Sequence, residues 1–123
     1  MNGISIVSDT NPLIYLLNGS DKAAEYLNGK QIWISAISEL ELFGKKGLTK
    51  YEKQEIELLI ESCFVAELSS GIKNIVKELL QTVNIKLPDA IVAATAMYLD
   101  LPLLTFDNDF IRIPDLKLFI LEK

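Results

Sequence analysis

Five short apolar runs alternate with stretches of helical pattern, and this alternation limits the possible folds more than any other feature of the sequence. The runs are rich in Ile, Val, Leu and Phe and occupy residues 4–8, 31–35, 63–68, 102–106 and 117–121. Strands that are apolar along their whole length and alternate with helices are typical of a parallel sheet covered on both faces. The sequence therefore predicts a three-layer α/β fold, and residues 1–123 suit a single domain without a linker.

The segments between these runs carry helix signals. Thr49 is a candidate N-cap, and Glu52 follows it three residues later, which is the pattern of a capping box. Pro88 suits the first turn of a helix over 87–99, whose residues are apolar on nearly every side, as expected of a buried helix. Further helices are predicted directly after the first run, over 20–29, from about residue 36, over 49–62 and over 69–83.

The chain contains no histidine, and this absence excludes whole classes of chemistry. Serine–histidine and cysteine–histidine catalysis are ruled out, so acid–base or metal chemistry has to rest on carboxylates. With 12 Lys and Arg against 17 Asp and Glu, the composition argues against a protein that holds nucleic acid through bulk positive charge. Cys63 is the single cysteine and makes no internal disulfide. No apolar run is long enough to span a bilayer, so we expect a cytoplasmic protein without a membrane segment.

Several acidic residues stand where a ligand of such a sheet binds, beyond the carboxyl ends of the strands. Asp9 follows the first run, Asp107 and Asp109 follow the fourth, and Asp89 stands at the head of the last long helix. Each alone has a simple structural explanation, because aspartate is a good N-cap and an acid in the first turn favours the helix dipole. Together, carboxylates at one edge of the sheet would repel one another and would need a cation to neutralise them.

A hard divalent cation is the partner that fits such a cluster. Mg²⁺ and Mn²⁺ prefer oxygen ligands, and their sites often combine one or two carboxylates with several waters. A water held in this way can attack a phosphoryl group while the metal offsets the charge on a phosphoryl oxygen. This chemistry needs no histidine, in agreement with the composition.

The stretch ISAISELELFG, residues 34–44, carries two glutamates inside an apolar segment. On a helix that begins near its third residue, the apolar stripe would be formed by Ala36, Ile37, Leu40 and Phe43. At about 100 degrees per residue, Glu39 and Glu41 flank this stripe on opposite sides, so periodicity leaves both open. Gly44 favours Glu41, because the missing side chain on their shared edge leaves room for a metal and a phosphate.

Four motifs together resemble a known family. They are SDTNPLIYLL at the start, ISAISELELFG after the second run, KLPDAIVAATA in the last long helix and LLTFDNDF near the end. In this order and spacing they are similar to the motifs of PIN-domain ribonucleases, of the kind found as VapC-like toxins of bacterial toxin–antitoxin pairs. The resemblance covers essentially the whole chain. One departure concerns Gly44: the family often has a small residue about a turn past its catalytic glutamate, and here the glycine follows Glu41 by three residues.

The resemblance implies a five-stranded parallel sheet with strand order 3-2-1-4-5 and Mg²⁺- or Mn²⁺-dependent cleavage of RNA phosphodiester bonds. By motif position, the catalytic and metal-binding residues would be Asp9, Glu41, Asp89 and Asp107, with Asp109 in reserve for the last place. The position of the family's glutamate, counted from the IS at the end of the preceding strand, falls on Glu41. The polar supports of the cluster would be Asn11 and Thr105.

The resemblance also implies partners. The substrate would be RNA, and VapC-like toxins are commonly encoded beside an antitoxin that wraps the toxin and inserts a basic residue toward the acidic site. Family members often pair, which implies a homodimer. Four lysines beside the predicted cleft would either contact RNA phosphates or form a solvated face, namely Lys45, Lys46, Lys50 and Lys53.

Other classes of protein stay open at this stage. A non-catalytic PIN relative would bind RNA or protein without cleaving it. A receiver-type signalling domain has a similar length, five parallel strands and a hydroxyl residue after its fourth strand, but its third strand should end on an aspartate, and here that run reads VAEL. A haloacid-dehalogenase-like phosphatase would need a second acid two residues after Asp9, where Asn11 stands.

Overall fold

The computed structural model describes residues 3–122, and a five-stranded parallel sheet forms its centre. The strands are β1 (Ser5–Ser8), β2 (Gln31–Ser35), β3 (Phe64–Ala66), β4 (Leu103–Thr105) and β5 (Leu118–Ile120). Their order is β3-β2-β1-β4-β5, and every pairing is parallel. The predicted fold class and strand order are therefore confirmed. A receiver domain has the order 2-1-3-4-5, so this alternative is excluded.

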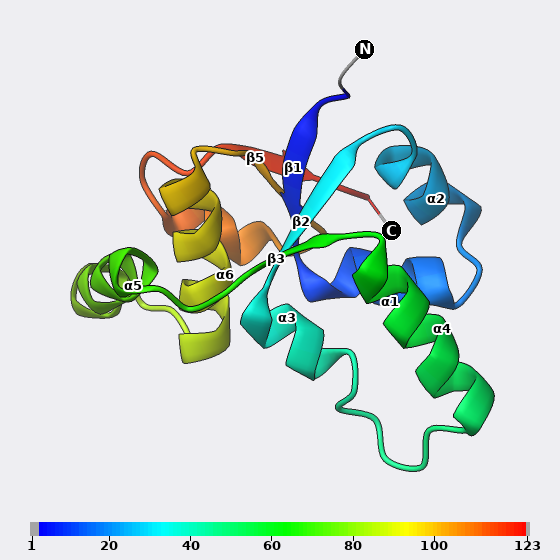
Figure 1. Ribbon diagram of the computed structural model, residues 1–123. Helices are drawn as coiled ribbons and strands as arrows, with labels where there is room; N and C mark the ends of the chain where they lie inside the picture. Colours follow the sequence, from blue (N-terminus) through cyan, green and yellow to red (C-terminus); the bar gives the residue numbers. More distant parts are fainter. Residues whose placement is uncertain (1–2, 123) are drawn as a thin grey trace.

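Helices cover both faces of the sheet (Figure 1). They are α1 (Thr10–Leu17), α2 (Asp21–Leu27), α3 (Ala36–Glu41), α4 (Lys50–Glu61), α5 (Ser70–Thr82), α6 (Leu87–Leu99) and the 3₁₀-helix η1 (Asn108–Arg112). One face is covered by α1, α2 and α4, and the other by α5 and α6. The short helix α3 follows β2 and contacts both α1 and α6, so it lies between the two helical layers at the carboxyl edge of the sheet.

The two faces of the sheet carry two separate hydrophobic cores. Ile6 and Leu104 pack with α1, α2 and α4, whereas their chain neighbours Val7 and Leu103 pack with α5 and α6. Because successive side chains of a strand point to opposite faces, a strand between two cores has to be apolar at every position. This requirement explains the continuous apolar runs of the sequence.

The predicted helix signals are present in the structure. Thr49 Oγ1 accepts a hydrogen bond from the backbone N–H of Glu52, and Glu52 Oε1 accepts one from the N–H of Thr49, both at 3.0 Å, which completes the capping box of α4. In α6 every residue from 90 to 96 is buried, as its apolar sequence predicts. Within residues 3–122, no helix is long and apolar enough to cross a membrane.

Candidate active site

Four acidic residues reach the carboxyl edge of the sheet from four different segments. Asp9 lies between β1 and α1, Glu41 is the last residue of α3, Asp89 lies in the first turn of α6, and Asp107 follows β4 by two residues. Their charges interact. After burial, which is the largest cause, the charges of Glu41 and Asp107 raise the pKa of Asp9, and those of Asp9, Asp107 and Glu41 raise the pKa of Asp89. The structure thus places the four within electrostatic reach of one another.

Asp9 is the most buried member of this cluster. Only 8% of its surface is exposed, and burial is the main reason that its pKa lies above the ordinary value. Its Oδ1 accepts a hydrogen bond from the backbone N–H of Thr10, and its Oδ2 accepts one from Thr105 Oγ1, each at 2.8 Å. These two bonds favour the charged carboxylate and partly oppose the effect of burial. Asp9 therefore caps α1 and also faces the other acids.

Thr10 connects Asp9 to the helix that carries Glu41. Its Oγ1 donates to Glu41 Oε1 at 2.6 Å and lies 2.9 Å from Ser38 Oγ, which is completely buried. Residues three apart share one face of a helix, so Ser38 and Glu41 present a hydroxyl and a carboxylate to the same partner. Glu39 lies in the first turn of α3, half-buried, and it is Glu41 whose charge acts on Asp9 and Asp89.

The predicted apolar stripe of α3 is wrong in one respect. Leu40 is 67% exposed, whereas Ser38 and Leu42 are buried. The reason is that α3 lies at the edge of the sheet. Its buried side carries Ser38, which contacts Thr10, and Leu40 is left exposed. The glycine at position 44 also has a local structural explanation. Its N–H donates to the carbonyl of Glu41 at 3.0 Å, and an added Cβ would lie only 3.1 Å from the same oxygen.

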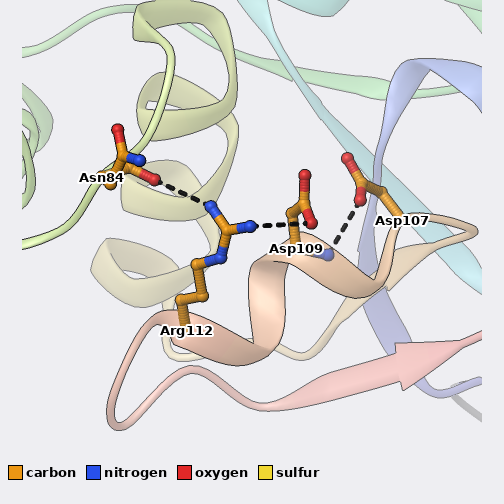
Figure 2. A network of polar contacts seen from close by, with 4 residues as sticks. All are labelled: Asn84, Asp107, Asp109 and Arg112. Atoms are coloured by element: carbon orange, nitrogen blue, oxygen red, sulfur yellow. Dashed lines mark hydrogen bonds and ion pairs between the residues drawn. The ribbon is translucent and has the colours of Figure 1, made fainter.

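Asp107 and Asp109 occupy different environments, although both lie near η1 (Figure 2). The backbone N–H of Asp107 donates to Thr105 Oγ1 at 3.0 Å, and Asp107 Oδ1 caps η1 by accepting from the N–H of Asp109 at 2.8 Å. Asp109 is exposed and forms an ion pair with Arg112 at 3.2 Å. Of the two, it is Asp107 whose charge adds to the effect of burial in raising the pKa of Asp9 and Asp89. Asp107 therefore interacts electrostatically with Asp9 and Asp89, and it is a better candidate for the last acid than Asp109.

Asp89 is half-buried and lines a hollow of about 270 Å³. Burial raises its pKa most, followed by the charges of Asp9, Asp107 and Glu41, while Lys86 acts in the opposite direction. The hollow is lined by Asn84, Ile85, Lys86, Asp89, Asp107, Asp109, Phe110 and Arg112. Asp89 thus connects the carboxylate cluster to an open space that a ligand can enter.

The remaining predicted site residues differ in whether they contact the acidic cluster. Thr105 supports both Asp9 and Asp107, as described above, whereas Asn11 is exposed in the first turn of α1. Lys45 lies with Glu41 along a second hollow, of about 250 Å³, and its Nζ is 3.6 Å from Glu52 Oε2. The other three lysines are exposed and line neither hollow, namely Lys46, Lys50 and Lys53.

Three residues near the site were missed from the sequence. Thr10 and Ser38 are hydroxyl residues in mostly apolar stretches, which is a weak signal for a buried polar contact. Arg112 is the only arginine of the chain, which is a signal that the sequence itself contains. Its ion pair with Asp109 is local, three residues apart on η1, whereas its contact with the carbonyl of Asn84 depends on tertiary structure.

The donors at this edge fit a hard divalent cation that keeps part of its hydration shell. All of them are oxygen atoms, the ligands that Mg²⁺ and Mn²⁺ prefer. In the described part of the chain, no three acidic or cysteine side chains lie close enough together to hold a metal ion as a ready-made cage. Sites with one or two direct carboxylates and several waters do not need such a cage. Burial, followed by the charges of the neighbouring acids, raises the pKa of Asp9 and Asp89, and a bound cation would favour the charged form of both carboxylates.

Fold and site together define a parallel α/β protein with an acidic site at the carboxyl edge of its sheet. The model of the PIN domain family matches residues 6–116. The chain therefore belongs to the PIN-domain family, which confirms the resemblance seen in the sequence. No curated protein matches the sequence.

Solved structures with the same fold include chains of toxin–antitoxin complexes. One is from a toxin–antitoxin complex of Klebsiella pneumoniae, with 33% identity over 89% of this chain and 92% of that chain and a TM-score of 0.79. Another is from VapBC-1 of nontypeable Haemophilus influenzae, with 26% identity over 95% and 98% and a TM-score of 0.78. A chain of the DNA-bound VapBC from Salmonella typhimurium, at 19% identity over 95% and 98%, shares the fold with a TM-score of 0.81.

Proposed function

We propose that the chain acts, as a single domain, as an endoribonuclease that requires Mg²⁺ or Mn²⁺ and serves as the toxin of a toxin–antitoxin pair. The observation that carries this proposal is the convergence of Asp9, Glu41, Asp89 and Asp107, where burial first and like charges second raise the pKa of Asp9 and Asp89. Such repulsion destabilises the folded protein, so a cluster of this kind favours a functional explanation over a structural one.

The residues of the cluster have distinct roles in this proposal. When bound, a divalent cation offsets charge on a phosphoryl oxygen and lowers the pKa of a coordinated water. Asp9 would be a ligand held in fixed orientation by Thr10 and Thr105, and its two oxygens retain acceptor capacity because each has two lone pairs. Asp89 and Asp107 would complete the set from the other wall of the site.

Glu41 is the candidate that orients the attacking water. It is more exposed than Asp9, and a neutral hydroxyl holds it, since Thr10 Oγ1 donates to its Oε1 at 2.6 Å. A carboxylate in this position can accept the proton that the water loses. The proton acceptor and the buried ligand Asp9 would thus be coupled through one residue, Thr10.

The proposed partners follow from the family and from the charge of the chain. RNA is the substrate, and an antitoxin is supported by the similarity to chains of toxin–antitoxin complexes. The net charge of −5 favours a basic antitoxin segment through electrostatic complementarity. A homodimer and RNA contacts by Lys45, Lys46, Lys50 and Lys53 stay predictions.

A cleavage assay on single-stranded RNA tests the proposed function. The wild-type protein is incubated with the RNA in Mg²⁺, in Mn²⁺ and in EDTA, beside Asp9→Asn and the matched control Asp21→Asn, an exposed aspartate on α2. We expect cleavage by the wild type and by Asp21→Asn in metal only, and none by Asp9→Asn. Cleavage in EDTA, or equal cleavage by Asp9→Asn, would contradict the mechanism. RNA binding without cleavage by the wild type would favour a non-catalytic PIN relative.

A further inference from the structure

Arg112 lies on the wall of the hollow that also contains Asp89 and Asp107. From η1 its guanidinium reaches two acceptors: Nη1 donates to the carbonyl of Asn84, and Nη2 donates to Asp109 Oδ1, both at 3.2 Å (Figure 2). These contacts hold the planar group in place although the side chain is 54% exposed. A guanidinium that is already oriented loses less conformational freedom when it binds another acceptor.

Lys86 brings a second cation to the same hollow. It is the N-cap residue of α6, it is exposed, and its charge lowers the pKa of Asp89. Lys86 and Arg112 are the two cationic residues among those that line the hollow. The hollow next to the carboxylate cluster is therefore lined by both acidic and basic residues.

A single-stranded RNA that binds at an acidic site needs positive charge beside the carboxylates. A cation held by the carboxylates would offset the charge of the phosphate that is cleaved, but the neighbouring phosphates would meet a chain of net charge −5. Phosphate contacts fix the position of a nucleic acid on a protein and require local positive charge where the overall charge is negative. Arginine suits this task, because its fork of N–H donors matches two phosphate oxygens.

We propose that Arg112 and Lys86 form a subsite for the RNA backbone phosphate next to the one that is cleaved. This inference rests on the proposed function, and it adds a substrate-binding surface distinct from Lys45, Lys46, Lys50 and Lys53. It gives the RNA strand a direction across the site, from the carboxylates toward η1 and the loop between α5 and α6.

Asp109 has a defined place in this subsite. Its carboxylate contacts the guanidinium of Arg112, and 67% of its side chain is exposed. Exposed ion pairs contribute little stability, so a phosphate can replace the carboxylate at small cost. Removing the charge of Asp109 should therefore tighten RNA binding, whereas removing Asp107 should impair the metal site.

The alternative role of Arg112 is purely structural. Its bond to the carbonyl of Asn84 connects η1 with the loop between α5 and α6, and this contact alone would stabilise the fold. A structural clamp and a phosphate contact differ in one measurable property: each phosphate contact on a single strand makes the negative slope of log Kobs against log salt steeper by about 0.7. Thermal stability responds to the clamp, and the salt slope responds to the phosphate.

The test measures binding of a labelled single-stranded RNA by fluorescence anisotropy over a series of KCl concentrations. All proteins carry Asp9→Asn and are kept in Mg²⁺, so that the RNA stays intact, and gels verify this. The variants are Arg112→Gln, Lys86→Gln, Arg112→Lys and Asp109→Asn. The matched control is Lys117→Gln, an exposed lysine paired with Asp100 at 2.9 Å and outside the hollow. The competing surface is tested with the double variant Lys46→Gln, Lys50→Gln.

We expect Arg112→Gln and Lys86→Gln each to lower the salt slope by about 0.7 and to weaken binding equally for RNAs of different sequence. Arg112→Lys should keep the slope, Asp109→Asn should bind about two- to fivefold more tightly, and Lys117→Gln should match its parent. A lower melting temperature with an unchanged slope in Arg112→Gln would overturn the inference in favour of a clamp. A slope that falls only in the Lys46, Lys50 double variant would also overturn it. In either case, cleavage by the wild type leaves the proposed function standing, and a wild type that neither binds nor cleaves RNA contradicts both.

Discussion

Replacing Thr105 with valine tests whether the hydroxyl at the end of β4 organises the carboxylate cluster. Thr105 is completely buried, and its Oγ1 donates to Asp9 Oδ2 at 2.8 Å and accepts from the backbone N–H of Asp107 at 3.0 Å. Valine has nearly the same shape, so the variant removes both hydrogen bonds without opening a cavity. The result isolates the polar contribution of one side chain to the site.

The expected loss follows from these two bonds. A hydrogen bond to a charged group contributes about 1.5–3 kcal/mol and a neutral one about 0.5–1.5 kcal/mol, so the free energy of unfolding should fall by about 2–4 kcal/mol. At about 2.1 cal/mol/K of unfolding entropy per residue, a chain of this size loses about 4 °C of melting temperature per kcal/mol. The melting temperature should therefore fall by about 8–16 °C.

The loss should also depend on pH. The bond from Thr105 lowers the pKa of Asp9, so the variant has an even higher folded-state pKa above the ordinary value of 3.8. When folding raises the pKa of an aspartate, the protonated form is favoured, and stability is lost as pH rises from the unfolded value through the folded one. The difference between the wild type and Thr105→Val should therefore grow with rising pH and shrink in acid.

Thermal unfolding followed by circular dichroism in EDTA, from about pH 4 to about pH 8, measures this difference. Thr95→Val is the matched control, because Thr95 is equally buried and its Oγ1 donates to the carbonyl of Ile91 within α6. The control should lose about 1 kcal/mol at every pH, and Thr105→Val should also lower RNA cleavage by about ten- to a hundredfold. Equal losses in the two variants, with no pH dependence and normal cleavage, would refute the reasoning.

Three further predictions concern the acids themselves. Asp89→Asn should abolish cleavage and raise the melting temperature in EDTA, because it removes a carboxylate whose pKa is raised by burial and like charges. The gain in melting temperature should vanish in acid, where the carboxylate is protonated. A loss of stability with normal cleavage would oppose this view. Asp107→Asn should lose cleavage while Asp109→Asn keeps it, and the reverse ranking in the same assay would reassign the last acid. Glu41→Gln should cut RNA about a hundredfold more slowly and Glu39→Gln at the wild-type rate, whereas equal rates would remove Glu41 from the site.

The fold was predictable because the sheet separates two hydrophobic cores. Neighbouring residues such as Ile6 and Val7 face opposite cores, so both have to be apolar, and this produces runs that are visible without tertiary information. Local capping rules were equally direct, as the pair Thr49 and Glu52 demonstrates. The strand order needed the family resemblance, since periodicity does not specify which strands are neighbours.

The details of the site were less accessible, because they depend on contacts between distant segments. Thr10 meets Ser38 and Glu41 only because α3 is turned at the sheet edge, and the stripe read from periodicity placed Leu40 on the wrong side. The contact of Arg112 with the carbonyl of Asn84 connects η1 to a loop that precedes α6. Residue type alone marks such side chains as unusual but does not show what they touch.

Calorimetric titration of Mn²⁺ into the metal-free protein tests most directly the claim that Asp9, Asp89 and Asp107 hold a divalent cation. The wild type should bind, Asp89→Asn should lose at least about tenfold in affinity, and binding should also stabilise the wild type against heat. Asp100→Asn, which removes an exposed aspartate paired with Lys117, should bind like the wild type. Equal Mn²⁺ affinity in the wild type and Asp89→Asn would contradict the account.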